Sequence, residues 1–173
     1  MDKIVPEKLI NFRAYHNGKD LLGITDIELP SIKYMTETIK GAGIAGEIDS
    51  PTLGHYASIE TKLNWRAIVK PLFELAATHG LHLDMRGAQQ MYDPATAQYK
   101  VVPVKVVIEG TPKTAELGKF DVGAATGSSN TIETTYIKIE VDKKTVLEID
   151  KYNFIATVNG EDYLADVREA LGL

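Results

Sequence analysis

The chain has 173 residues, 44% of them hydrophobic and 25% charged, so its length and composition fit one soluble globular domain and exclude wholesale disorder. Its net charge of −5 argues against a nucleic-acid-binding surface, since such surfaces are basic, and its lack of cysteine excludes disulfides, thiolate metal sites and cysteine nucleophiles. No stretch resembles a signal peptide or a membrane anchor, so we expect the protein to fold in a cytoplasm.

The pattern of residues 9–29 predicts a β-hairpin. Two extended runs flank the dipeptide Asn17-Gly18, and both of these residues tolerate the positive φ angles of a tight turn. Pro30 follows the second run, and it either ends that strand or lies at a sheet edge. We therefore expect the domain to begin with two paired strands.

A long protruding hairpin is predicted over about residues 37–65. Two extended arms, 31–40 and 55–65, flank a glycine-rich centre that suits neither a helix nor a strand interior. Because long open loops are usually functional or disordered, we expect this centre to be mobile in a free subunit and to become ordered by docking onto another copy of the chain. The predicted contact residues of this arm are Lys40, Gly41, Gly43, Ile44, Gly46, Glu47, Asp49, Pro51 and Gly54.

The returning arm alternates with a period of two residues, as a strand does when one side packs on a core and the other meets water. Its apolar side carries Ala57, Ile59, Thr61, Leu63 and Trp65, and its polar side carries Ser58, Glu60, Lys62 and Asn64. A later run alternates in the same way, with Val102, Val104, Val106 and Ile108 on one side and Lys105 and Glu109 on the other. Pro103 in that run indicates a sheet edge or a bulge.

Two helices are predicted. The first begins near Lys70, because Pro71 is tolerated best in a first turn, and it ends before Gly80. The second is a short amphipathic helix within 161–171, capped by Gly172.

The remaining segments favour strands joined by turns. The total is seven or eight strands and two helices in a single, mainly β domain that spans residues 1–173. The further predicted strands are 81–93, 98–110, 131–141 and one or two within 145–158, and residues 110–130 are predicted to form an exposed loop.

One glycine motif invites a cofactor interpretation that its context contradicts. Residues 41–46 match G-x-G-x-x-G, the fingerprint of a dinucleotide site, which must open a helix that receives the pyrophosphate. Here Pro51 and Gly54 break any such helix, and Glu47 and Asp49 would repel phosphate. We therefore expect a flexible loop and no cofactor.

No group of residues indicates an enzyme or a metal site. His79 and His82 are three residues apart, but Gly80 ends the helix between them and spacing places no third ligand. The sequence has no G-x-S-x-G nucleophile elbow. What stands out instead is a surplus of extended structure, whose open edges a monomer must protect and a ring of identical subunits can close.

Several segments, taken together in their order and spacing, resemble the major tail tube proteins of contractile-tailed bacteriophages, in particular the P2-like family that also occurs in R-type bacteriocin particles. The resemblance covers nearly the whole chain and is weakest over about residues 85–130. The segments that carry it are NGKDLLGITDIELP, KGAGIAGEID, LAATHG, EIDKYNFIATVNGED and the final LGL.

The resemblance implies a β-barrel or sandwich with a flanking helix and a long protruding hairpin. It implies that six copies form a ring around a continuous inner barrel, that rings stack into a rigid tube, and that residues 40–54 contact the adjacent ring. Six chains of −5 would place about −30 on each ring, which favours passage of DNA without binding if enough of that charge faces inward. The candidate lumen residues are Glu60, Lys62, Asn64, Lys105 and Glu109.

The implied location is a virion tail or a phage-tail-like particle that assembles in the bacterial cytoplasm. The implied partners are further copies of the chain, the tail sheath, the baseplate and tail terminator proteins, the tape-measure protein during assembly and, in a phage, DNA in transit. Two alternatives stay open: a tube protein of a type VI secretion system and a monomeric β-barrel binding module.

Overall fold

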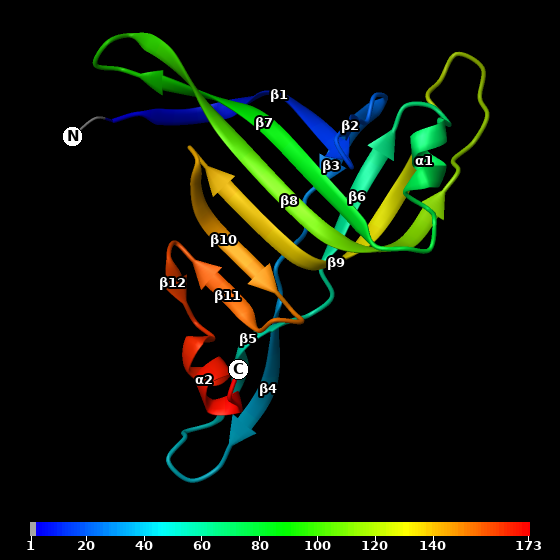
Figure 1. The fold of residues 1–173 in the computed structure, drawn as a ribbon. Helices are drawn as coiled ribbons and strands as arrows, with labels where there is room; N and C mark the ends of the chain where they lie inside the picture. The colour runs from blue at the N-terminus through cyan, green and yellow to red at the C-terminus, as the bar shows by residue number, and fades with distance from the viewer. Residues whose placement is uncertain (1–2) are drawn as a thin grey trace.

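A computed structural model describes residues 3–173 and shows a mainly β protein (Figure 1). Met1 and Asp2, which begin the predicted domain, lie outside the described residues. Within the described range the chain forms twelve strands and two helices. These are β1 (Val5–His16), β2 (Lys19–Asp20), β3 (Ile24–Glu28), β4 (Tyr34–Lys40), β5 (Glu47–Tyr56), β6 (Glu60–Trp65), α1 (Lys70–Glu74), β7 (Leu81–Asp93), β8 (Gln98–Glu116), β9 (Ser128–Val141), β10 (Lys144–Asp150), β11 (Ile155–Val158), β12 (Glu161–Asp162) and α2 (Ala165–Leu171).

Ten of these strands form one antiparallel sheet that branches at β9. The main order is β12-β11-β10-β9-β8-β7-β1-β2. One edge of β9 pairs with β8, whereas the other pairs with β6 over residues 128–133 and with β10 over residues 136–141. β3 pairs with β6, so β6 and β3 form a second branch of the sheet beyond β9. A cleft separates β3 from β1, β7 and β8. This partly closed barrel confirms the predicted fold class.

Gly110 allows β8 to stay paired where β9 changes partners. The ladder between β8 and β9 shifts its register beside this glycine. A Cβ atom at Gly110 would lie only 2.0 Å from the carbonyl oxygen of Glu133, so no larger residue fits there without backbone movement. Pro103 lies just beyond the other end of this ladder, where its carbonyl accepts a hydrogen bond from the Asp142 N–H. It pairs with Ala88 of β7, and β8 lies between β7 and β9, so this proline marks the end of one ladder and not an edge strand.

The core lies between the two branches of the sheet and α1. α1 begins as predicted, with Pro71 in its first turn and Leu72 buried. Asn130 holds this helix to the sheet, because its side chain accepts a hydrogen bond from the Trp65 indole (2.8 Å) and donates one to the Leu72 carbonyl (3.1 Å). The largest buried apolar side chains are Trp65, Ile59, Leu63, Leu72, Leu75, Leu83, Ile108, Ile132, Ile137 and Ile149.

The first predicted hairpin is only partly right. The turn is at Asn17 and Gly18, both at positive φ, and Tyr15 pairs with Asp20. The second strand ends at Asp20, however, and residues 24–28 pair with β6 instead. The neighbouring Leu21 is buried, and the positive φ of Gly23 redirects the chain toward β6.

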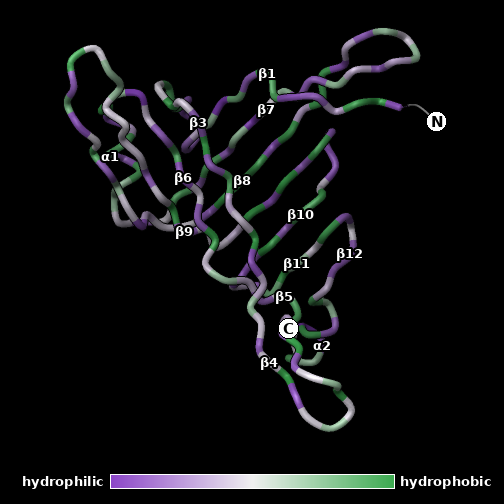
Figure 2. The backbone as a smooth tube through the Cα atoms, turned by 180° about the vertical axis from the view of Figure 1, so that it is seen from behind, coloured by the Kyte–Doolittle hydropathy of each residue, from purple (hydrophilic) through white to green (hydrophobic). Residues whose placement is uncertain are grey.

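The protruding hairpin is present, but its strands differ from the prediction. β4 pairs with β5, whereas residues 60–65 of the expected returning arm belong to the main sheet as β6. Residues 47–54 are therefore strand and not loop, and the turn contains only residues 41–46. The hairpin projects away from the main sheet in both the ribbon and the tube view (Figure 1; Figure 2).

Three more boundaries differ from the prediction. The first helix ends at Glu74 and not just before Gly80. The predicted loop at 110–130 is confined to residues 117–127, because β8 continues to Glu116 along β9. The last helix begins at Ala165 and not near Glu161, since Glu161 and Asp162 form β12 against β11. Gly172 caps this helix in the left-handed conformation, as expected.

Candidate functional site

The β4–β5 hairpin has two unlike faces. On one face Thr38 donates a hydrogen bond to the Asp49 carboxylate (2.8 Å), and Lys40 pairs with Glu47 (3.6 Å). Directly paired residues share a face and the next pair points to the other side, so Ile39 and Ile48 lie together on the opposite face. Both isoleucines are exposed, at 43% and 51%. The tip therefore presents two apolar side chains that are about half open to solvent.

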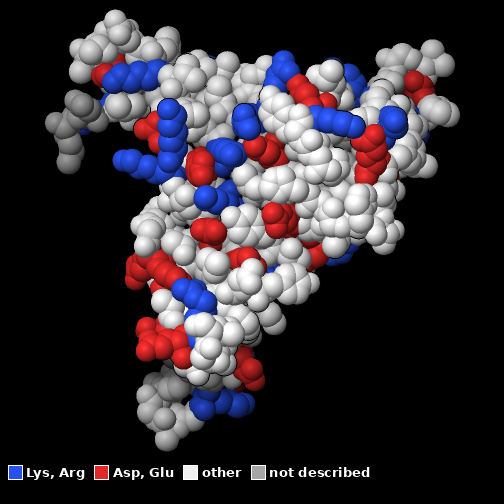
Figure 3. Space-filling model, viewed as in Figure 1, with Lys and Arg blue, Asp and Glu red and all other residues white. Residues whose placement is uncertain are grey.

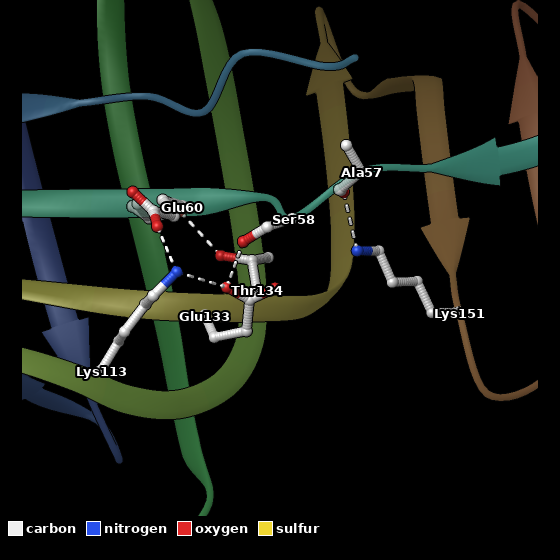
Figure 4. Close-up of polar contacts among 8 residues, drawn as sticks. Ala57, Ser58, Glu60, Lys113, Glu133, Thr134 and Lys151 are labelled. Atoms are coloured by element: carbon white, nitrogen blue, oxygen red, sulfur yellow. Dashed lines mark hydrogen bonds and ion pairs between the residues drawn. The ribbon is translucent and has the colours of Figure 1, made fainter. Parts of the chain in front are cut away.

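The root of the hairpin is held to the rest of the domain. The Ala57 N–H donates to the Lys33 carbonyl (2.8 Å), and the Lys151 ammonium donates to the Ala57 carbonyl (3.0 Å; Figure 4). The Tyr34 and Tyr56 rings contact each other, with their centroids 5.3 Å apart. The hairpin is thus anchored at one end and open to solvent at the other.

The predicted contact residues divide between the tip and the strands. Gly41, Gly43 and Gly46 have positive φ in the turn, where a Cβ atom would meet nothing within 4 Å. Ile44 also lies in this turn, and Lys40 and Glu47 close it from the two strand ends.

Asp49, Pro51 and Gly54 lie within β5 and not in a mobile loop. Gly54 is at the root of the hairpin, at φ +62°, and its Cα lies against the buried Leu164 before α2. This glycine is therefore a packing position and not a hinge, because a larger side chain would collide with Leu164.

All five candidate lumen residues lie on the sheet surface that faces away from the core. Glu60, Lys62 and Asn64 alternate with buried residues on β6, and Lys105 and Glu109 do so on β8. The structure brings Glu60 into a cluster, in which Lys113 bridges Glu60 and Glu133 (Figure 4). Lys105 and Glu109 belong to other ion pairs on the same surface.

This polar surface carries several ion pairs. On β7, Asp84 pairs with Arg86 (2.9 Å) and lies 3.8 Å from the Lys105 ammonium. His82 contacts the Glu109 carboxylate at 3.1 Å. Charges of both signs lie next to one another over this part of the molecule (Figure 3). The surface is hydrophilic, and opposite charges neutralise one another locally.

The charge contacts shift the pKa values in the expected directions. The hydrogen bond to Glu60 raises the pKa of Lys113, and the hydrogen bond to Asp84 raises that of Arg86. Burial, followed by the hydrogen bond to Glu148, raises the pKa of Tyr136 to about 12. These cations and the phenol therefore keep their protons at neutral pH.

Some residues of this surface escaped the sequence prediction. His82, Asp84 and Arg86 alternate with buried Leu81, Leu83 and Met85, so a period of two could have identified them. Lys113 was missed because residues 110–130 were taken for a loop. No local signal pairs Lys113 with Glu60, which is 53 positions away in the chain.

The described residues were compared with the requirements of a metal-ligand cluster and of a membrane-spanning helix, and neither is found. Among residues 3–173, no group of three or more His, Asp or Glu side chains is placed to hold a metal ion. His79 contacts the Ala77 carbonyl, whereas His82 contacts Glu109, so the two histidines are not brought together. Neither described helix is long and apolar enough to cross a membrane.

Comparison with known proteins identifies the family. The sequence model of the family described as Phage tail tube protein FII matches residues 6–172. The chain belongs to this phage tail tube family. The tail tube protein of Escherichia phage P2 is 28% identical over 174 residues, covering 98% of this chain and 99% of the relative. The major tail tube protein of Serratia phage KSP20 is 28% identical over 171 residues, covering 98% of each.

Solved structures share the fold of this tail tube protein. The sheath/tube terminator of the PVC extracellular contractile injection system superposes with a TM-score of 0.56 at 12% identity, over 78% of this chain and 96% of the other. A chain of the sheath-tube complex of the same system gives a TM-score of 0.52 at 12% identity, over 78% of this chain and 91% of the other.

The family settles what the geometry suggests. The chain is a structural subunit of the tail tube of a contractile tail, and it is a component of the virion tail or of a phage-tail-like particle. Its relatives are structural proteins and not enzymes. The alternatives of a type VI tube protein and of a monomeric binding module are set aside in favour of this family.

Proposed function

We propose that six copies of the chain form a ring, that rings stack into the inner tube of the tail, and that the β4–β5 hairpin docks on the adjacent ring. The observation that carries this proposal is the hairpin itself, a separate two-stranded sheet with its apolar face open to solvent. Monomeric proteins usually cover such faces, and an adjacent copy of the chain is the partner that a self-assembling tube supplies.

The energy available at the hairpin tip supports its docking role. Fully burying an exposed isoleucine is worth about 1.5–3 kcal/mol, and Ile39 and Ile48 are about half exposed, at 43% and 51%, so covering both contributes about 1.5–3 kcal/mol per contact. Six equivalent contacts between two rings would multiply this gain, while the loss of translational freedom is incurred once for the whole ring.

Edge pairing would supply the contacts within a ring. Residues 5–13 of β1 pair with β7 along one edge, and their other edge has no partner strand among the described residues. The sheet therefore ends there in a long open edge. The opposite edge ends with the short β12. Closing such edges against identical neighbours gives a continuous barrel, which is rigid because every strand is hydrogen-bonded on both sides.

The charged surface suits a lumen. It carries the candidate residues Glu60, Lys62, Asn64, Lys105 and Glu109, of which Glu60, Lys105 and Glu109 belong to ion pairs. A ring of six carries about −30 in total, which would keep DNA from adhering in a phage if enough of that charge faces the lumen, whereas a bacteriocin particle would pass no DNA.

The further partners follow from the type of machine. We propose that a sheath surrounds the tube and drives it through an envelope, and that baseplate, terminator and tape-measure proteins contact it during assembly. Support comes from the shared fold with chains of a sheath-tube complex and of a sheath/tube terminator.

Replacing the apolar face of the tip tests the proposal. The variant Ile39→Ser with Ile48→Ser should stay a folded subunit, since both side chains are exposed. It should form tubes only at concentrations at least about tenfold higher than those that suffice for the wild type. The matched control is Thr36→Ala with Thr38→Ala on the opposite face, which should polymerise normally.

Negative-stain imaging and size-exclusion chromatography would give the result. Normal tubes from the isoleucine variant would refute the docking role of the hairpin. A wild-type chain that remains a strict monomer at high concentration would refute ring formation itself.

A further inference from the structure

The loop between β8 and β9, residues 117–127, exposes two hydrophobic side chains almost completely. Phe120 is 91% exposed and Val122 is 103% exposed, higher fractions than those of any other large hydrophobic residue among the described ones. The loop lies beside α1, on the flank of the sheet remote from the N-terminal arm and far from the hairpin tip (Figure 1; Figure 2). We call Phe120 and Val122 the knob.

Hydrogen bonds at its base hold this loop in one shape. The Lys119 N–H donates to the Thr126 carbonyl (2.9 Å), and the Thr126 N–H donates to the Arg66 carbonyl (3.1 Å). The Ser128 hydroxyl donates to the Leu117 carbonyl (2.8 Å). Gly118 is required there, because a Cβ atom would lie 2.0 Å from the Thr126 carbonyl oxygen. The knob is therefore preorganised, which reduces the entropy lost on binding.

A matching cleft opens between β3 and the β1–β7–β8 part of the sheet. Its volume is about 360 Å³, within the size range of pockets that enclose small organic groups. The cleft is open to solvent, since Leu9 is 49% exposed and Leu29 is 55% exposed. Its apolar lining includes Leu9, Phe12, Ile27, Leu29, Met85 and Val106.

Apolar side chains, and not charges, would carry a contact between the knob and the cleft. The charged residues in the cleft lining already have partners within the subunit, since Asp26 of β3 accepts a hydrogen bond from Asn64 (3.0 Å) and Arg86 of β7 pairs with Asp84 (2.9 Å). Lys119 and Asp121 flank Phe120 in the sequence, so the knob carries one charge of each sign and brings no net charge to the cleft.

We propose that the knob of one subunit inserts into the cleft of its neighbour in the same ring. This rests on the ring assembly proposed above and adds the side chains that join adjacent subunits. The knob and the cleft are different surfaces, so their contact is head to tail, and a head-to-tail contact closes a ring when its rotation divides a full turn. The hairpin lies elsewhere and is left for the next ring.

Disulfide trapping tests this contact, and the natural chain helps because it contains no cysteine. The variant Phe120→Cys with Leu29→Cys should give, on mild oxidation of assembled protein, a ladder of covalent oligomers that ends at the closed ring. The control Phe120→Cys with Tyr152→Cys moves the second thiol to another exposed side chain, 79% exposed in the turn after β10, and should give only background cross-linking.

Removing the ring of Phe120 tests how much this side chain contributes to the free energy of assembly. Phe120→Ala should leave the thermal melt of the free subunit unchanged and should raise the concentration needed for assembly about ten- to a hundredfold. Tyr152→Ala is the matched control, an exposed aromatic ring removed elsewhere, and it should assemble like the wild type.

The outcomes separate the two proposals. If wild-type tubes form but the Phe120–Leu29 pair cross-links no more than the control, the knob contact is overturned and the ring stands. If Phe120→Ala tubes form normally yet no longer hold the sheath, the knob binds the sheath and this inference is again overturned. A wild-type chain that never assembles overturns the ring proposal itself.

Discussion

Substituting Gly54 by alanine would test how the hairpin is fixed to the domain. Gly54 has φ +62°, and a Cβ atom built there would lie 2.4–2.5 Å from Cγ and both Cδ atoms of Leu164. Because Leu164 is buried and three of its atoms are too close, its whole side chain would have to move. Alanine in the left-handed region costs about 1–2 kcal/mol, and overpacking costs about 1–3 kcal/mol more. We therefore expect Gly54→Ala to lower the free energy of unfolding by about 2–5 kcal/mol.

This effect is measurable by urea denaturation or calorimetry of the unassembled subunit. For a domain of this size, about 2–5 kcal/mol corresponds to a loss of about 4–20 °C in Tm. The matched control is Gly43→Ala in the turn, where φ is also positive (+88°) but a Cβ atom meets nothing within 4 Å. That variant should lose only the free energy that alanine costs at a left-handed backbone conformation, at most about 1–2 kcal/mol.

Comparing the two alanine variants isolates the effect of the collision with Leu164. If Gly54→Ala destabilises the subunit no more than Gly43→Ala, the close approach to Leu164 is wrong. A second check is the double variant with Leu164→Ala, whose loss should be less than the sum of the single losses, since the small side chain removes the collision.

Two further predictions concern the core and the response to acid. Trp65→Phe removes the indole N–H that reaches buried Asn130, so we expect a loss of about 1–3 kcal/mol in urea unfolding, and a loss below about 0.5 kcal/mol would contradict the role of this bond. The hydrogen bond from Arg168 lowers the pKa of Asp162 in the folded state. The ionised Asp162 therefore stabilises the fold at pH values above its unfolded pKa of about 3.9, and this stabilisation is lost as the pH falls through the lower folded pKa. Thermal melts of the wild type should therefore drop below about pH 4, and Asp162→Asn should show a shallower drop; an equal slope in both proteins would refute the assignment.

Local patterns predicted the parts of the fold that local chemistry controls. The alternation of Thr61, Leu63 and Trp65 with polar neighbours gave the right buried face of β6, because strand side chains alternate whatever the strand pairs with. The turn at Asn17-Gly18 and the start of α1 at Pro71 were also predicted correctly, since each depends on the backbone preferences of one or two residues.

The candidate site was harder to predict, since it depends on contacts between distant residues. Gly54 appeared to be one more flexible glycine until Leu164, from the end of the chain, was found against it. Glu60 was expected on a polar face, but its partner Lys113 was hidden in a predicted loop. The exposed Phe120 gave no signal in the sequence, because a hydrophobic residue in a loop can equally be buried.

By itself, the sequence determined most of the extended segments, the apolar side of β6 and β8, and that a hairpin with a glycine-rich turn interrupts the chain. These features depend on residues close together along the chain. Only the tertiary structure decided that β4 pairs with β5, that β6 joins β9, and that β9 divides its edge between β6 and β10. The physical reason is that any strand offers the same backbone donors and acceptors to several partners, so the packing of the whole core selects among them.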